Sequence, residues 1–310
     1  MKISVIIPVH NEEANISNLY SRLRGSISPL GISSELIFVN DGSSDNSLAQ
    51  IKKLADTDRD VFFIDLSRNF GHQVAVSAGL DHCKGDSVVI IDADLQDPPE
   101  LIPDLYNKLC EGYNVVYAKR RSRTGEGILK AMTAKIFYRL LSRITSISIP
   151  LDTGDFRIVD RKVVDALREM HEQEKFLRGQ IAWIGLRQTS VEYDRGERAA
   201  GRTGYTYRKM IRLALDGITS FSDLPLKLAT AAGFVVSGIA LPLMSYTLYS
   251  RFVSKDYVPG WASLMLSVLF LGGIQLVCLG VIGEYVSRLG SNVRKRPLYV
   301  VGEGKLPKDN

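Results

Sequence analysis

Short apolar runs alternate with amphipathic stretches through the first 120 residues of the chain. The apolar runs, which predict strands, are residues 3–8, 35–39, 61–66, 88–91 and 113–118. The stretches with apolar residues at helical spacing are residues 11–23, 46–54, 73–82 and 101–111. Strands that alternate with helices predict an α/β fold with a mostly parallel, doubly wound, Rossmann-like sheet.

The stretch 88–100 is the centre of the functional prediction, because four aliphatic residues run directly into two carboxylates. We expect the strand to end near Asp94, since the two prolines that follow cannot continue a central ladder. Alternation along an extended chain then points Asp92, Asp94 and Gln96 the same way. Their oxygens suit Mg²⁺ or Mn²⁺. The competing interpretation is that these carboxylates cap the following turn and helix.

Polar side chains also follow the other predicted strands. These clusters are His10, Asn11 and Glu12, then Asp41, Gly42 and Ser43, then Lys119, Arg120 and Arg121. The carboxyl ends of parallel strands meet in one crevice, and a crevice with carboxylates, a metal and basic side chains suits a nucleotide diphosphate. The competing interpretations are a turn and N-cap for Asp41 and a first helical turn for Glu12. The chain has no dinucleotide-binding or P-loop glycine motif, which argues against dehydrogenases and P-loop NTPases.

The middle of the chain contains two basic segments. Residues 128–144 combine apolar residues at helical spacing with a basic stripe. This pattern is typical of a helix on an anionic membrane surface, and equally of a core helix with a solvated face. Asp155 belongs to the next polar cluster. Residues 195–208, which include Arg202, have the composition of a loop that closes over phosphates, or alternatively of an exposed linker.

The last third predicts a membrane hairpin. Residues 228–249 and 261–282 carry no charge, and each is long enough to cross a bilayer core of about 30 Å. Cations are fewer in the connection than in the outer flanks, so the positive-inside rule places the catalytic domain and both termini in the cytoplasm. The alternative is a buried helical hairpin in a soluble core. The predicted units are a catalytic domain, an interfacial segment, a transmembrane hairpin and a tail, at residues 1–205, 206–227, 228–286 and 287–310.

Composition narrows this picture only slightly. The formal net charge of +5 over 310 residues is compatible with an anionic lipid, a phosphorylated substrate or nucleic acid. Cys83, Cys110 and Cys278 are too few and too scattered for a disulfide framework or a zinc site. The N-terminus predicts a strand and lacks the pattern of a signal peptide.

Five motifs stand out along the chain: IPVHNEE at 7–13, VNDGSSD at 39–45, NFG at 69–71, DADLQDPPE at 92–100 and GRTGY at 201–205. Together they resemble the family 2 glycosyltransferases of the GT-A fold. More narrowly, they resemble polyprenyl-phosphate glycosyltransferases, which include bactoprenol glucosyltransferases and dolichol-phosphate mannose synthases. Many mannose synthases have histidine at the position of Asp97, which favours the bacterial branch. The Q-x-x-R-W string of processive polymerases is absent.

The resemblance implies roles for individual residues. Base, ribose and nucleotide-sugar contacts are implied for Pro8, His10, Glu12, Asp41, Asp92 and Ala93. The implied metal ligands are Asp94, Gln96 and Asp92. Arg120 and Arg202, chosen over Arg121 and Arg198, are implied to contact phosphate, and Asp155 resembles the family's candidate base. A lipid phosphate is largely ionised near neutral pH, so we rank Asp155 as base below Asp94 as metal ligand.

The resemblance also implies an activity. We expect an inverting transfer of a hexose, with UDP-glucose favoured as donor, to polyprenyl phosphate, dependent on Mg²⁺ or Mn²⁺. GDP-mannose is the alternative donor, and a non-catalytic membrane adaptor is the alternative from another class. We further expect a multi-pass protein of the plasma membrane that forms a homo-oligomer and binds no nucleic acid.

Overall fold

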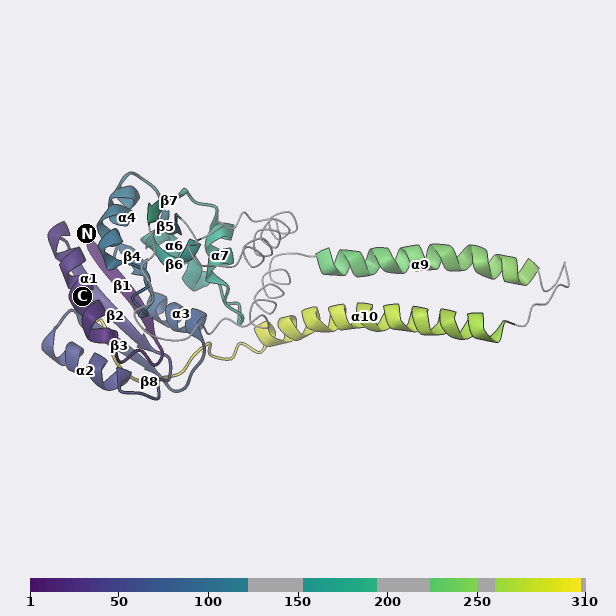
Figure 1. Ribbon diagram of the computed structural model, residues 1–310, viewed down its shortest axis with the longest axis horizontal. Helices are drawn as coiled ribbons and strands as arrows, with labels where there is room; N and C mark the ends of the chain where they lie inside the picture. The colour runs from purple at the N-terminus through teal and green to yellow at the C-terminus, as the bar shows by residue number, and fades with distance from the viewer. Residues whose placement is uncertain (122–152, 194–223, 250–259, 308–310) are drawn as a thin grey trace.

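The computed structural model describes residues 1–121, 153–193, 224–249 and 260–307. These residues form an α/β domain and a pair of long helices (Figure 1). The predicted helix at 128–144, the arginine-rich stretch at 195–208 and most of the interfacial segment lie outside the described residues.

Eight strands form one mixed sheet in the order β7-β5-β6-β4-β1-β2-β3-β8. Their bounds are β1 Lys2–Val9, β2 Ser33–Asn40, β3 Val61–Leu66, β4 Ser87–Ile90, β5 Val115–Arg120, β6 Thr153–Asp160, β7 Gln188–Tyr193 and β8 Val301–Lys305. The four adjacent strands β4, β1, β2 and β3 are parallel, as predicted. β6 runs antiparallel to both β4 and β5, and β8 runs antiparallel to β3. The α/β fold is therefore confirmed, and the sheet is more mixed than the sequence indicated.

Helices cover both faces of the sheet. The helices of the domain are α1 Ile16–Ile27, α2 Ser47–Thr57, α3 His72–His82, α4 Ile102–Cys110, α6 Arg161–Glu169 and α7 Leu177–Ile184, with short 3₁₀ turns η1 Ser28–Leu30 and η2 Pro99–Leu101. α1, α2 and α4 pack on one face, whereas α3, α6 and α7 pack on the other. Side chains alternate along β1, so Val5 belongs to the first core and Ile6 to the second. Both faces being buried explains why the parallel strands are continuously apolar.

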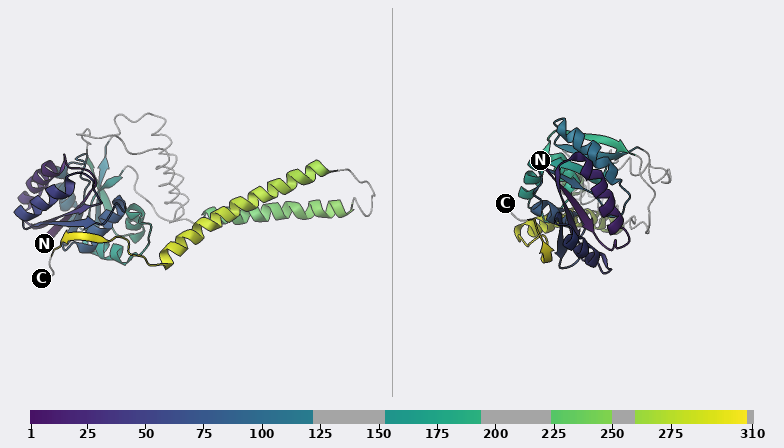
Figure 2. Two further views of the ribbon diagram at one scale, coloured as in Figure 1. Left: turned by 90° about the horizontal axis from the view of Figure 1, so that it is seen from below. Right: turned by 90° about the vertical axis from the view of Figure 1, so that its left-hand side faces the viewer.

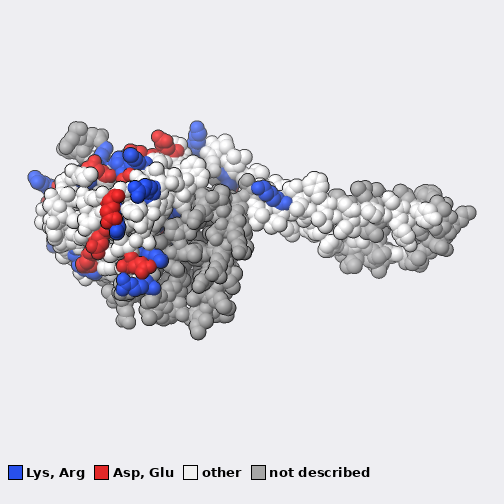
Figure 3. Space-filling view, turned by 90° about the horizontal axis from the view of Figure 1, so that it is seen from above, with Lys and Arg blue, Asp and Glu red and all other residues white. Residues whose placement is uncertain are grey.

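Two helices, α9 Leu224–Tyr249 and α10 Trp261–Val293, pack side by side and project from one end of the domain (Figures 1 and 2). Apolar side chains along them face outward, including Phe234 and Phe270, which are 76% and 65% exposed. Figure 3 shows charged side chains over the domain and few on the described surface of the helical pair. An exposed apolar surface of this extent needs a cover, such as lipid or another protein.

One helix among the described residues, Phe270–Val293, is long and apolar enough to cross a membrane by length and composition. In α9 the apolar stretch found among the described residues, Leu224–Val236, is shorter than a membrane span requires. Only one of the two predicted spans is therefore supported. α10 begins at Trp261, where the second predicted span begins, and it continues past the predicted end at residue 282. Glu284 and Arg288 form an ion pair at 3.0 Å within this extension.

The chain returns to the α/β domain after α10. β8 comes from the segment that the sequence analysis treated as a tail, and it adds an edge strand beside β3. Lys52 on α2 pairs with Glu303 on β8 at 2.5 Å. Both ends of the helical pair are thus connected to one sheet.

Candidate active site

A pocket of about 220 Å³ opens at the carboxyl ends of β1 and β2, beside the loop that precedes α3. The residues that line it are Pro8, Val9, His10, Asp41, Asn69, Gly71 and His72. Three predicted nucleotide-binding residues, Pro8, His10 and Asp41, therefore meet at the predicted edge of the sheet. This convergence follows from the parallel pairing of β1 with β2.

Asp41 shapes one wall of this pocket. Its two carboxylate oxygens accept hydrogen bonds from the backbone N–H groups of Phe70 at 2.7 Å and Gly71 at 3.0 Å. Its backbone oxygen lies 2.9 Å from Nδ1 of His10, whose ring also lies within 3.3 Å of the Asn69 amide. The buried Asp41 carboxylate holds the loop in place, which agrees in part with the turn interpretation of this motif.

Glu12 is not among the lining residues. Its carboxylate accepts a hydrogen bond from the side chain of Asn15 at 2.6 Å, and its backbone N–H donates to the hydroxyl of Ser47 at 2.9 Å. These contacts join the start of α1 to the start of α2. In the described structure Glu12 therefore organises the region next to the pocket.

The strand before Asp92 is shorter than predicted. β4 ends at Ile90, and Asp92 and Asp94 lie in a turn where Leu95 has a left-handed φ of 59°. Asp94 Oδ1 accepts a hydrogen bond from the Gln96 backbone N–H at 3.1 Å. Turn residues do not alternate as strand residues do, so the alternation argument for Asp92, Asp94 and Gln96 is wrong. Ala93 is buried in the same turn.

His72, which the sequence analysis did not single out, lies between Asp92 and Asp155. Its Nε2 atom is 3.5 Å from Oδ1 of Asp92 and 3.4 Å from Oδ2 of Asp155. Nε2 is buried, although the side chain as a whole is 39% exposed. Burial would lower the pKa of His72, but Asp92 and Asp155 raise it to about 9. A positively charged imidazole therefore separates the two carboxylates near neutral pH.

Asp92 is the carboxylate in this cluster with an oxygen that can still contact a cation. Its Oδ1 atom is buried and accepts no hydrogen bond from the part of the chain that the structure describes. Burial raises the pKa of Asp92 to about 6, His72 opposes this rise, and the neighbouring carboxylates of Asp155, Asp97 and Asp94 add to it. Its ionised form therefore gains from any additional positive charge that reaches Oδ1.

Asp155 is held by two arginines. Arg178 on α7 donates to both oxygens of Asp155, at 2.9 and 3.1 Å, and the buried Arg157 donates to Oδ1 at 3.0 Å. Burial alone would raise the pKa of Asp155, but Arg178, His72 and Arg157 lower it well below its usual range. Asp155 is consequently a weak proton acceptor, and it links β6, α3 and α7 at the site.

Comparisons with known proteins identify the family of the chain. Residues 4–168 match the family described as Glycosyl transferase family 2, and residues 224–289 match the family described as the GtrB C-terminal hairpin. The chain belongs to the family 2 glycosyltransferases. The mixed α/β sheet of this glycosyltransferase is accordingly of the GT-A type, as the sequence motifs predicted.

Relatives are similar to this glycosyltransferase over nearly its whole length. "Uncharacterized glycosyltransferase sll0501" of Synechocystis is 48% identical over 98% of this chain and 95% of its own. "Prophage bactoprenol glucosyl transferase homolog" of Escherichia coli is 42% identical over 97% of this chain and 98% of its own. Glucosyl-3-phosphoglycerate synthase from Mycobacterium tuberculosis, solved with Mn²⁺, UDP and phosphoglyceric acid, has a TM-score of 0.47 and 24% identity over 70% of this chain and 76% of its own. Because the first two of these matches cover 97–98% of this chain, those relatives are similar to it in the helical pair as well as in the α/β domain.

The two predicted arginines are not placed at the site. Arg120 is the last residue of β5, where its backbone pairs in register with Tyr193 of β7. Its side chain and the whole of Arg202 lie outside the described residues. Their phosphate contacts therefore stay predictions for this glycosyltransferase.

The residues around Asp92 fit a divalent metal that binds together with the donor. Among the described residues, no group of three or more His, Cys, Asp and Glu side chains could hold a metal by itself. Mg²⁺, however, commonly uses one or two protein carboxylates plus substrate phosphates. The buried Oδ1 of Asp92, which has no hydrogen-bond donor among the described residues, and the carboxylate of Asp94 two residues later supply such a pair. Gln96, the third predicted ligand, is buried in the same turn.

A side chain at Gly42 would collide with the 68–71 loop that forms part of the pocket wall. Its φ is +61°, and a Cβ atom there would lie 2.5 Å from the backbone nitrogen of Asn69. We expect Gly42→Ala to displace the 68–71 loop, to raise the donor KM about tenfold and to lower the free energy of unfolding by about 1–3 kcal/mol. Steady-state kinetics and thermal unfolding would measure both.

Gly31→Ala is the matched control, because Gly31 has a φ of +65° and no atom within 4 Å of the added Cβ. It should carry the backbone penalty alone and leave the donor KM unchanged. An equal rise of KM in both variants would show that the close approach to Asn69 does not matter.

Proposed function

We propose that this glycosyltransferase transfers a hexose, with UDP-glucose as the favoured donor, to polyprenyl phosphate at the cytoplasmic face of the plasma membrane. The observation that carries the proposal is that one chain joins a cleft at the carboxyl ends of β1 and β2 to a pair of helices with an exposed apolar surface. Relatives named bactoprenol glucosyl transferase support the acceptor, such as that of Shigella phage SfII, 41% identical over 97% of both chains.

The path of the chain supports a two-span topology. β1 and β8 belong to the same sheet, so the chain that leaves the domain before α9 returns to it after α10. If α10 crosses the bilayer, the chain must cross an even number of times to return. α9, which packs against α10, is the available second crossing. The greater number of cations in the outer flanks supports a cytoplasmic location for the domain and both termini.

The chemistry follows from the charges of the donor and the acceptor. A phosphate oxygen of the lipid attacks the anomeric carbon, the bond from that carbon to the nucleoside diphosphate breaks, and a single displacement inverts the carbon. A divalent metal held by Asp92 and Asp94 would stabilise the charge on the leaving diphosphate. The acceptor is ionised near neutral pH, with a second pKa of about 6, so a strong general base is unnecessary. The tight pairing of Asp155 with Arg178 agrees with this, since Asp155 is a poor base.

A donor screen tests the proposal. Purified full-length protein would be incubated with undecaprenyl phosphate, Mg²⁺ or Mn²⁺ and radiolabelled UDP-glucose or GDP-mannose. We expect label from UDP-glucose in the lipid extract, and no label after chelation with EDTA. Faster transfer from GDP-mannose would favour the mannose synthase alternative. Absence of lipid-linked label from both donors would overturn the proposed reaction.

A further inference from the structure

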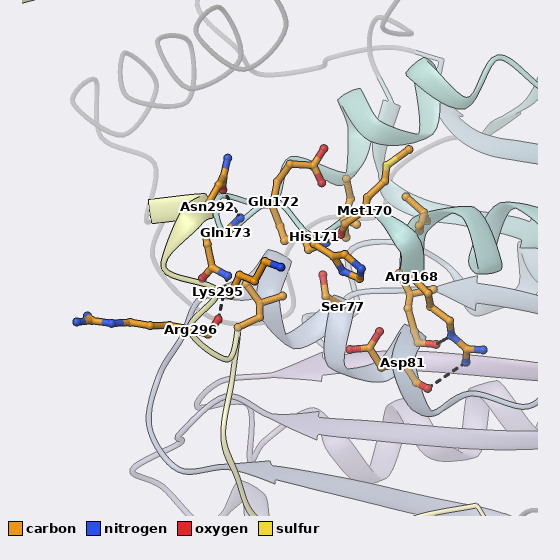
Figure 4. Close-up of a pocket in the computed structure, with 15 residues that line it drawn as sticks. Ser77, Asp81, Arg168, Met170, His171, Glu172, Gln173, Asn292, Lys295 and Arg296 are labelled. Carbon is orange, nitrogen blue, oxygen red and sulfur yellow. Dashed lines mark hydrogen bonds between the residues drawn. The ribbon is translucent and has the colours of Figure 1, made fainter. Parts of the chain in front are cut away.

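The segment 170–178 connects the end of α10 to the active site. At one end, the backbone N–H of Gln173 donates to Oδ1 of Asn292 at 3.0 Å, and its side-chain amide donates to the backbone oxygen of Arg296 at 2.9 Å (Figure 4). The next residue, Glu174, forms an ion pair with Arg288 of α10. The helical pair therefore contacts the domain through this segment.

The other end of the segment reaches Asp155. The backbone N–H of Leu177 donates to Oε1 of Gln73 at 3.1 Å, and Gln73 directly follows His72 on α3. The next residue of α7, Arg178, forms the bidentate ion pair with Asp155. Only four residues of chain thus lie between the contact with α10 at Gln173 and the contact with the catalytic cluster at Arg178.

A cavity of about 440 Å³ lies beside the segment between these two anchors, bounded by α3, the end of α6, residues 170–177 and the end of α10 (Figure 4). His171, Glu172 and Glu174 are exposed. Where side chains do not fill the space under a segment, dispersion contacts on that side are lost and polar contacts determine its position. The hydrogen bonds to Asn292 and Arg296 are such contacts.

We propose that Gln173 and Asn292 are positioning residues, through which α10 holds Arg178 against Asp155. The helical pair then anchors the enzyme and also fixes the geometry of the active site. The donor pocket lies at the other end of α3 and shares no lining residue with the cavity. Loss of the Gln173–Asn292 contact should therefore reduce turnover and leave donor binding unchanged. This inference rests on the proposed function only in so far as transfer is one of its two readouts.

Variants of the full-length protein in lipid nanodiscs would test the proposal. Asn292→Ala removes the acceptor for the Gln173 N–H, and Gln173→Glu places a carboxylate against the Arg296 carbonyl. Both should lower kcat about threefold to tenfold, the range of a net hydrogen bond, with the donor KM changed less than twofold. Asn292→Asp retains an acceptor oxygen and should restore kcat. Ser291→Ala is the matched control, since among the described residues its hydroxyl donates within α10, to the backbone oxygen of Ser287 at 3.1 Å.

Hydrogen exchange of the α7 amides gives the second readout. Exchange should be faster in Asn292→Ala and Gln173→Glu than in wild type, and unchanged in Ser291→Ala. Wild-type kcat and wild-type exchange in both variants would overturn the inference, as would a raised donor KM at constant kcat. If the wild type transfers no sugar, the proposed function fails, and the exchange measurement still decides whether α10 positions α7.

Discussion

Asp94→Ala is expected to lower transfer about 10³-fold while the protein stays folded. Asp94 lies in a turn at the edge of the sheet, outside both apolar cores, so its loss leaves no cavity. If Asp94 and Asp92 hold the metal that offsets the charge on the leaving diphosphate, removing one carboxylate removes a contact that strengthens as that charge develops. Losses of 10²–10³-fold are typical when one such stabilising group is removed. Initial rates with saturating donor and acceptor would measure the effect.

The metal dependence of the rate distinguishes this role from a structural one. Asp94→Asn retains an oxygen ligand without the charge, so it should need a higher Mn²⁺ concentration for half-maximal rate than wild type. Asp56→Ala, which removes an exposed carboxylate from α2, serves as the control and should behave as wild type. Transfer by Asp94→Ala at the wild-type rate, with the same metal dependence, would contradict the assignment of Asp94 to the metal.

The parallel part of the fold was predictable because it is encoded locally. β1 to β4 are buried on both faces, so each appears in the sequence as an apolar run bounded by polar residues. β6 and β8 were missed for a different reason. β6 interleaves the polar Asp155 and the buried Arg157 with apolar residues, and β8 is an exposed edge strand with two glycines. Neither pattern indicates a strand until its partner in the sheet is known.

The donor half of the site was predictable, whereas the cluster around Asp155 was not. Pro8, His10 and Asp41 follow strands directly, so strand order alone brings them to one pocket. His72 and Arg178 reach the site on the first turns of α3 and α7. A lone histidine after a glycine and a lone arginine in a helix carry no signal in a single sequence. The sequence feature closest to His72 is the NFG motif at 69–71, which directly precedes it and is predicted to be a loop.

Arg178→Ala is expected to lower kcat about 10²-fold, because Asp155 then loses its only two-pronged partner among the described residues. Arg157 and His72 stay in contact with Asp155, so the carboxylate keeps partial charge compensation and the protein should fold. Charge-assisted hydrogen bonds contribute about 1.5–3 kcal/mol each, which makes a loss of this size reasonable for a site that depends on the position of Asp155. Arg178→Lys keeps the charge but offers no planar fork, so it should recover the activity only in part.

A double-mutant cycle decides whether Arg178 acts through Asp155. Asp155→Asn removes the charge that Arg178 holds, so Arg178→Ala should cost little further activity in that background, and the two effects should be strongly non-additive. Steady-state rates of the wild type, both single variants and the double variant give the coupling. Independent, multiplicative losses would mean that Arg178 contacts a substrate directly. In that case the ion pair would be a consequence of two separate binding roles, and Asp155 would need another explanation for its place between α3 and α7.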